Sequence, residues 1–262
     1  RTGCRGGPAS HILEAKNVKM YFGGVHAVDD VSLYVDRNET LGIIGPNGSG
    51  KTTFFNALTG IYQPTAGQFI YCGQDITGKD LDKMANFGIA RTFQNLRVFR
   101  ALTAWDNALI GQNINIKTNF VDNLFHTKRY KEEEEKASEL VAQAIKTVGL
   151  EGSEREIVGS MPYGKQKRVE LARALMCEPK LLLLDEPTAG MNSVEAQELM
   201  ELVQEIKEQQ KISIILIEHN MKVMMKVSNR IVAMDHGRKI AEGLPEEIQN
   251  NKQVIEAYLG GK

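Results

Sequence analysis

The chain has 262 residues, of which 42% are hydrophobic, and its 32 Lys and Arg residues nearly balance its 33 Asp and Glu residues. This length can bury one large or two small cores, and the balanced charge provides no polycationic surface for nucleic acid. Aliphatic runs such as Leu181–Leu184 and Ile214–Ile217 are far shorter than the roughly 20 residues of a membrane-spanning helix. Composition therefore excludes a membrane span and argues against a nucleic-acid-binding protein.

The first ten residues, RTGCRGGPAS, lack the apolar core of a secretory signal. We expect residues 1–10 to be a disordered leader or a tag remnant outside the fold. The three cysteines, Cys4, Cys72 and Cys177, lie far apart and have no metal-ligand spacing. This usage is typical of reduced thiols in a cytosolic protein.

The first part of the chain mixes strand and helix signals. Residues 11–36 predict short strands, because apolar and polar residues alternate there. Residues 40–60 then predict a strand, a glycine-rich turn and a helix that ends at Gly60. Turn residues follow, and residues 68–72 predict another strand.

The middle of the chain changes character. Residues 103–148 carry almost no strand signal, and residues 128–150 predict an amphipathic helix whose charged run, 131–136, forms its solvated face. The apolar face of this helix carries Leu140, Val141, Ala144, Ile145 and Val148. A helical insertion therefore interrupts the strands.

The alternation of strands and helices returns after residue 176. The pattern predicts strands over residues 181–185 and 212–218, a helix over Ser193–Lys207 between them, and a hairpin around residues 235–238. Together these elements indicate an α/β fold in which a parallel-sheet nucleotide core is interrupted by the helical insertion.

One segment matches the phosphate-loop pattern G-x-x-x-x-G-K-[ST] in full: Gly45, Pro46, Asn47, Gly48, Ser49, Gly50, Lys51 and Thr52. Its glycines let backbone N–H groups turn toward phosphate oxygens, Lys51 adds a positive charge, and the Thr52 hydroxyl can bind Mg²⁺. The alternative is an ordinary glycine-rich turn between a strand and a helix. Because the lysine, the hydroxyl and both flanking elements are present, the sequence predicts binding of a nucleoside triphosphate.

Two carboxylates, Asp185 and Glu186, end the predicted strand LLLLD. In a phosphate-loop fold, an Asp at a strand end holds Mg²⁺, and a second carboxylate beside it can orient and deprotonate the attacking water. The alternative is that both residues only end the strand and cap the next element. The phosphate loop favours the catalytic interpretation.

Two further polar residues are candidates for the reaction. His219 follows the strand over residues 212–218, at an edge where ligands of open α/β sheets collect, and can donate a hydrogen bond to a γ-phosphate. Gln94 lies where the strands give way to the insertion and could contact Mg²⁺ or the attacking water. The alternatives are a structural histidine and a surface-loop glutamine.

A helix opens near Gly164 in the segment MPYGKQKRVELARAL, and its first turn carries Lys165, Lys167 and Arg168. Cations at a helix N-terminus oppose the helix dipole by about 0.3–1 kcal/mol each. We therefore expect this turn to receive an anion.

The order of these motifs resembles that of the ATPase subunits of ABC transporters: phosphate loop, Gln94, glycine-led helix, LLLLDE, then His219. The resemblance extends over about the whole chain after the leader. It implies a P-loop nucleotide-binding core with an antiparallel β subdomain over residues 11–95 and 178–262. An inserted α-helical signature subdomain would occupy residues 96–177.

The resemblance also implies ATP and Mg²⁺ as cofactors and assigns the residues that hold them. The implied catalytic residues are Lys51, Gln94, Glu186 and His219, and the implied metal ligands are Thr52, Gln94 and Asp185. The implied nucleotide contacts within the chain are Gly45 to Thr52, Thr53 and two residues that hold the adenine, Phe22 and Val28. Tyr163, Gly164, Lys165 and Gln166 would grip the γ-phosphate of ATP held by the other subunit of a head-to-tail dimer.

Two residues to which the resemblance gives a role also have structural alternatives. Phe22, which would stack on the adenine, could instead belong to the core, and Tyr21 could exchange roles with it. Asn192 would lie in the loop that joins the two subunits, but with Glu195 three residues later it also matches a helix N-cap box.

The family signature reads Leu-Ser-Gly-Gly-Gln, whereas the same places here read Pro162, Tyr163, Gly164, Lys165 and Gln166. Tyrosine is far longer than serine, so whether Tyr163 makes the contact of the serine hydroxyl stays open, while Lys165 still offers its backbone N–H. The joining loop has Asn192 where the family commonly has Asp. These departures leave Lys51 and the strand-end carboxylates intact, so hydrolysis is expected.

A narrower resemblance follows from the YGxQ signature together with the segments RTFQNLRVF, AGMN and VIEAYLG. They are similar to one subunit of the branched-chain amino-acid importers. The resemblance implies a peripheral protein on the cytoplasmic face of a bacterial or archaeal plasma membrane. Its partners would be membrane permease subunits, an identical or homologous second ATPase subunit and, indirectly, an extracytoplasmic substrate-binding protein.

Three alternatives stay open. An ATPase of lipopolysaccharide export shares the overall pattern but not the extended helical region. A P-loop kinase would transfer phosphate to a small acceptor and has no use for the Gly164 helix or His219. A non-hydrolytic ATP sensor would not need Glu186.

Overall fold

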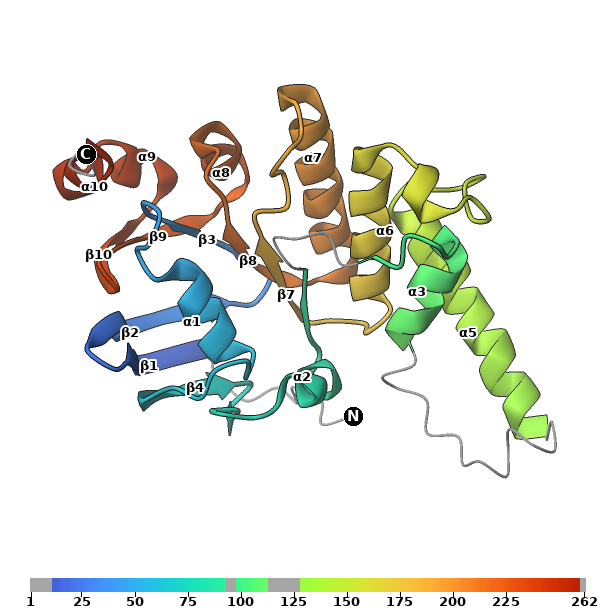
Figure 1. The fold of residues 1–262 in the computed structure, drawn as a ribbon, viewed down its shortest axis with the longest axis horizontal. Helices are drawn as coiled ribbons and strands as arrows, with labels where there is room; N and C mark the ends of the chain where they lie inside the picture. Colours follow the sequence, from blue (N-terminus) through green and yellow to red (C-terminus); the bar gives the residue numbers. More distant parts are fainter. Residues whose placement is uncertain (1–10, 93–97, 113–127, 260–262) are drawn as a thin grey trace.

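The computed structural model describes residues 11–92, 98–112 and 128–259. The predicted leader over residues 1–10 and Gln94 therefore lie outside the described residues. Two β-sheets with helices on their faces form this part of the chain (Figure 1).

The first sheet is antiparallel, with strand order β2-β1-β4-β5. Its strands are β1 (His11–Phe22), β2 (Val25–Asp36), β4 (Ala66–Tyr71) and β5 (Gln74–Asp75). Its first two strands have 12 residues each, where the sequence predicted short strands. Bulges explain the difference: the register shifts around Val18, and Asn17 and Asp30 adopt φ of 49° and 61°. Each bulge breaks the alternation on which the sequence pattern depends, so one long hairpin resembles several short strands.

The second sheet has the order β10-β9-β3-β8-β7-β6 and is parallel apart from the β9–β10 hairpin. Its strands are β3 (Thr40–Ile44), β6 (Ile89–Arg91), β7 (Leu181–Asp185), β8 (Ser213–Ile217), β9 (Arg230–Asp235) and β10 (Arg238–Gly243). The predicted hairpin forms as expected, with His236 and Gly237 at φ of 42° and 77° in a two-residue turn. The predicted α/β class with a parallel core and an antiparallel sheet is confirmed.

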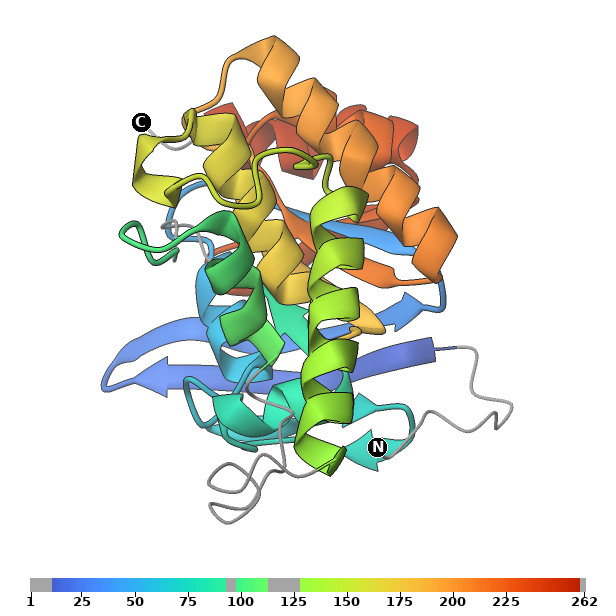
Figure 2. The same cartoon turned by 90° about the vertical axis from the view of Figure 1, so that its right-hand side faces the viewer.

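The helices fall into three groups. Helices α1 (Lys51–Leu58) and α2 (Leu81–Phe87) belong to the first third of the chain. Helices α3 (Ala104–Gln112), α5 (Lys128–Thr147) and α6 (Tyr163–Leu175) pack against one another at one end of the molecule (Figure 2). Helices α7 (Ser193–Gln210), α8 (Met221–Val227), α9 (Pro245–Gln249) and α10 (Lys252–Leu259) complete the chain. The predicted boundary between residues 95 and 96 lies outside the described residues, so the division into subdomains stays a prediction.

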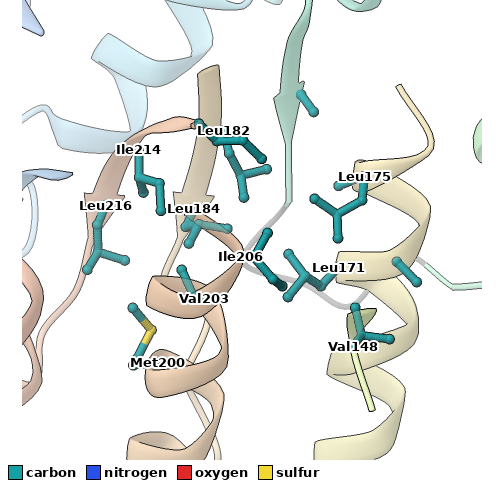
Figure 3. Packing of buried hydrophobic residues seen from close by; sticks show 14 of the residues in the cluster. Val148, Leu171, Leu175, Leu182, Leu184, Met200, Val203, Ile206, Ile214 and Leu216 are labelled. Atoms are coloured by element: carbon teal, nitrogen blue, oxygen red, sulfur yellow. The ribbon is translucent and has the colours of Figure 1, made fainter. Parts of the chain in front are cut away.

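Strand β7 separates the two halves of the core. Leu181 and Leu183 face a cluster with the α1 phenylalanines, whereas Leu182 and Leu184 face α6 and α7 (Figure 3). All four leucines are at most 1% exposed, and each such burial contributes about 1.5–3 kcal/mol. Because both faces of the strand are covered, its sequence is a continuous apolar run instead of an alternating one.

The apolar face predicted for α5 packs into the half of the core that contains Leu182 and Leu184. The buried residues on this face are Val141, Ala144, Ile145 and Val148, and Leu140 packs against them. Among the described helices, none combines the length and apolar character needed to cross a membrane. Cys177 is a free thiol, but Cys72 is disulfide-bonded, so the expectation of reduced thiols is wrong at that position.

Candidate functional site

The phosphate loop connects β3 to α1 at the carboxyl edge of the parallel sheet. Gly50 precedes the helix with φ of 98°, and no described side chain caps the first turn of α1. The N–H groups of a first helical turn have no partner within the helix, and the helix dipole favours an anion beside them. This turn is therefore a suitable place for phosphate oxygens.

Gly45 begins the loop in a position that no other residue can occupy. Its φ is 152°, and an added Cβ would lie 2.1 Å from the Met234 carbonyl oxygen and 2.6 Å from Ser49 Oγ. The loop thus passes directly against the end of β9.

Lys51 is folded back onto the loop. Its Nζ donates to the carbonyl oxygens of Gly45 and Pro46 at 2.7 and 2.9 Å and to Ser49 Oγ at 3.2 Å. Burial lowers the pKa of Lys51, whereas the nearby carboxylates of Glu186 and Asp185 act in the opposite direction. A buried ammonium group held by neutral oxygens is well placed to pair with an incoming phosphate.

Asp185, at the end of β7, forms a buried ion pair with Arg91 of β6. The Arg91 Nη2 to Asp185 Oδ2 distance is 2.8 Å, and the two side chains are 4% and 2% exposed. Arg91 Nη1 also donates to Asn56 Oδ1 at 2.8 Å and to Thr59 Oγ1 at 3.0 Å. Sequence reasoning missed Arg91, because nothing local in the sequence indicates its partner 94 residues away.

The second oxygen of Asp185 fits a metal ion. Within the described part of the chain, Asp185 Oδ1 is buried and has no hydrogen-bond partner. Burial raises the pKa of Asp185 above its ordinary value, although the ion pair with Arg91 acts in the opposite direction. A buried carboxylate oxygen that lacks a donor gains from a cation, and Mg²⁺ prefers such oxygen ligands. The predicted ligand set of Asp185 and Thr52 therefore suits Mg²⁺, while Gln94 lies outside the described residues.

Glu186 and His219 lie in direct contact. His219 Nε2 is 2.7 Å from Glu186 Oε1, and the side chains are 44% and 12% exposed. They meet because β7 and β8 are neighbouring parallel strands whose carboxyl ends reach the same edge. Glu186 adopts φ of 51°, a left-handed conformation that costs a non-glycine residue about 1–3 kcal/mol and clusters at functional sites.

Glu218 organises the backbone around this pair. Its Oε1 accepts hydrogen bonds from the Thr188 backbone N–H at 2.9 Å and hydroxyl at 2.5 Å, and its Oε2 accepts one from the His219 N–H at 3.1 Å. Glu186, His219, Thr188 and Glu218 line a cavity of about 190 Å³. Sequence reasoning did not identify Glu218, although a charged residue at the end of the buried strand β8 was a signal.

The residues predicted to hold adenine separate into exposed and buried ones. Phe22 is 43% exposed and meets Tyr62 edge-to-face, with 5.2 Å between the ring centroids. Tyr21 stacks on His26 and donates its hydroxyl to Asp29 at 2.7 Å, so it is already engaged. Val28 has no exposed surface, and its side chain packs in the core.

The signature turn opens α6 after Pro162, and no described side chain caps it. The Gln166 side chain turns inward and donates to the Met161 carbonyl at 2.8 Å, while Lys165 donates to Ser153 Oγ at 2.9 Å. The Tyr163 side chain is 39% exposed. Because the side chains of Gln166 and Lys165 are engaged elsewhere, the groups of this turn that can face an anion are the backbone N–H groups, which have no partner within the helix. Figure 1 shows α1 and α6 on opposite sides of β7, so one chain does not bring its signature turn to its own phosphate loop.

Asn192 forms the predicted N-cap box of α7. Its side chain accepts from the backbone N–H groups of Val194 and Glu195 at 2.9 and 3.0 Å. The Glu195 carboxylate accepts from the Asn192 N–H at 3.1 Å. The structural alternative for Asn192 is therefore realised, whatever further role the loop has.

Comparison with known proteins agrees with this geometry. Residues 28–189 match the family model described as ABC transporter, and residues 238–262 match that of the branched-chain amino acid ATP-binding cassette transporter. The chain is 42% identical to the high-affinity branched-chain amino acid transport ATP-binding protein BraF of Pseudomonas aeruginosa over 249 residues. That match covers 95% of this chain and 98% of that protein. The corresponding protein of Escherichia coli K12, LivG, is 39% identical over the same share of each chain.

Solved structures show the same fold. The crystal structure of the ADP conformation of an ATP-binding cassette of an ABC transporter matches with a TM-score of 0.84 at 32% identity, covering 95% of this chain and 99% of that one. A nucleotide-free cassette of an ABC transporter matches with a TM-score of 0.82 at 34% identity, covering 95% and 98%. The chain belongs to the ABC transporter family, as an ATP-hydrolysing cassette subunit.

Proposed function

We propose that this chain powers an importer of branched-chain amino acids by hydrolysing ATP between two ATPase subunits. One observation carries the hydrolytic part: Lys51, Asp185 and the Glu186–His219 pair converge on the edge of the sheet where the phosphate loop opens. The names of its 39–42% identical relatives support the class of cargo.

Each group has a task that its surroundings support. The Glu186 carboxylate takes a proton from the attacking water, and His219 holds both that carboxylate and the γ-phosphate in place. Lys51 leaves the loop carbonyls and pairs with phosphate oxygens. Thr52 and Asp185 would hold Mg²⁺, which when bound adds positive charge beside the phosphates.

The second half of the site comes from a partner in this proposal. The α6 first turn lies away from its own phosphate loop, so its backbone N–H groups would face the γ-phosphate bound by a second, head-to-tail ATPase subunit. That subunit can be identical or homologous. Membrane permease subunits at the cytoplasmic face of the membrane, and a substrate-binding protein beyond them, would complete the importer.

Glu186→Gln tests the hydrolytic role, with the exposed Glu198→Gln on α7 as the matched control. Phosphate release should fall by about 10²-fold or more in Glu186→Gln and stay unchanged in the control, while both variants keep their affinity for ATP. Full turnover in Glu186→Gln would refute the assignment of the base. Phosphate appearing on a small acceptor instead of in water would favour the kinase alternative.

Two measurements test assembly and cargo. The solution mass of Glu186→Gln should double on addition of Mg-ATP if two identical chains close on nucleotide. A constant monomer mass would mean that closure needs a different partner chain or the permease. Vesicles that contain the reconstituted importer should take up leucine only when ATP is present on the side of the membrane that holds this subunit. Uptake of other solutes without uptake of leucine would contradict the proposed cargo.

A further inference from the structure

The C-terminal helix α10 is docked beside the phosphate loop. Val254, 4% exposed, anchors the helix in the core, and Asn251 Oδ1 accepts from the Gln253 N–H at 2.9 Å to cap its first turn. Gln253, Glu256 and Ala257 lie on one face of α10 and line a cavity of about 760 Å³ together with residues 46–49 of the loop. The helix therefore forms one wall of the space outside the loop.

One residue of α10 touches the loop itself. The Gly45 backbone N–H donates a hydrogen bond to the Tyr258 hydroxyl at 2.9 Å, across 213 residues of sequence. The Tyr258 side chain is 40% exposed, but desolvation raises the pKa of its hydroxyl, which keeps the phenol neutral. A neutral hydroxyl can accept the amide hydrogen bond without adding a negative charge to a site meant for phosphate.

Gly45 is thereby fixed from three directions. The Met234 carbonyl and the Ser49 hydroxyl lie where a side chain would be, and Tyr258 satisfies the amide. Gly45 in turn presents its carbonyl oxygen to Lys51 at 2.7 Å. A shift at this first residue would move both the lysine and the turn that follows.

We propose that Tyr258 is a positioning residue through which the C-terminal helix sets the affinity of the phosphate loop for nucleotide phosphates. The inference rests on the proposed nucleotide site. Tyr258 lies in the segment matched by the branched-chain amino acid cassette model, outside the residues 28–189 matched by the general family model. The hydrogen bond from Gly45 to Tyr258 therefore depends on the C-terminal segment, and Tyr258 is not part of the motifs that hold the nucleotide.

Tyr258→Phe in the full chain tests this, with Tyr34→Phe on β2 as a matched loss of one hydroxyl away from the loop. Two quantities are measured in each protein. The first is the dissociation constant for Mg-ADP, by calorimetry. The second is the hydrogen-exchange rate of the segment over residues 42–50 without added nucleotide, by mass spectrometry.

In Tyr258→Phe, affinity for Mg-ADP should fall about three- to tenfold, which is the range expected for loss of one net hydrogen bond. Exchange of the loop segment should become faster, while strand β8 and the Tyr34→Phe control stay as in the wild type. Unchanged affinity or unchanged loop exchange in Tyr258→Phe would overturn the proposal. If the wild type itself does not bind Mg-ADP, the proposed function fails instead, and loop exchange still decides the role of Tyr258.

Discussion

Removing Arg91 should strongly destabilise the fold, because it leaves the Asp185 carboxylate buried without its cation. In Arg91→Met, a side chain of similar length keeps most of the packing against the Phe55 ring, over which the guanidinium lies at 5.4 Å. The charge and three hydrogen bonds, to Asp185, Asn56 and Thr59, are lost. Breaking a buried pair by removing one partner costs about 3–5 kcal/mol.

The loss should depend on pH in a defined direction. Burial already raises the pKa of folded Asp185 above its ordinary value of 3.8, and removal of Arg91 raises it further. A carboxyl group whose folded pKa is raised contributes stability that is present below the unfolded pKa and is lost as pH rises through the folded pKa. The deficit of Arg91→Met relative to the wild type should therefore be larger at pH 8 than at pH 5.

Urea denaturation followed by Trp105 fluorescence, the signal of the single tryptophan, measures both effects. Lys226→Met is a suitable control, because its ion pair with Glu201 at 2.8 Å is exposed and should contribute little. A loss below about 1 kcal/mol in Arg91→Met, or a loss independent of pH, would show that the pair does not carry the energy assigned to it.

Substitutions at Gly45 and Asn192, each paired with a control variant, test local geometry. Gly45→Ala should abolish most Mg-ADP binding and lower the melting temperature, because its Cβ would collide with the Met234 carbonyl oxygen at 2.1 Å. Gly164→Ala is the control, because nothing lies within 4 Å of its added Cβ, and it should keep the melting temperature of the wild type. Equal losses of melting temperature in the two variants would contradict the steric explanation for Gly45. Asn192→Ala should lower the free energy of unfolding by about 0.5–2 kcal/mol in urea denaturation, and Asn192→Gly by only a few tenths, whereas equal losses would exclude a capping role.

The sequence was informative where a short pattern has a single physical solution. The phosphate loop is such a case, since Gly45 and a lysine six residues later can be recognised in the sequence without knowing the rest of the fold. The φ of 152° at Gly45 then explains why a glycine stands there. The contact between Glu186 and His219 was also predictable, because each follows a buried parallel strand. Their meeting required only that the two strands be neighbours.

Arg91 and Tyr258 mark the limit of such reasoning. Each acts on the site through a partner 94 or 213 residues away, and neither lies in a pattern that points to that partner. Val28 shows the same limit from the other side, because the family resemblance implied a contact with adenine, while the fold buries its side chain completely in the core. Long-range packing decides such cases, and local spacing carries no information about it.

A chain of hydrogen bonds also connects the phosphate loop to the end of β1, where the residue predicted to hold the adenine lies. Gly237, in the β9–β10 turn, donates its N–H to the Ser49 carbonyl at 3.1 Å and accepts at its own carbonyl from the Asp29 N–H at 2.7 Å. The Asp29 carboxylate accepts from the Tyr21 hydroxyl and pairs with Arg238 at 2.7 Å each, and these contacts lower its pKa and keep it ionised. Asp29 is therefore held between the strand that ends in the exposed aromatic ring and the turn that supports the loop. A loop fixed in this way before ATP arrives has little ordering left to lose on binding, so binding free energy remains for closing two subunits together.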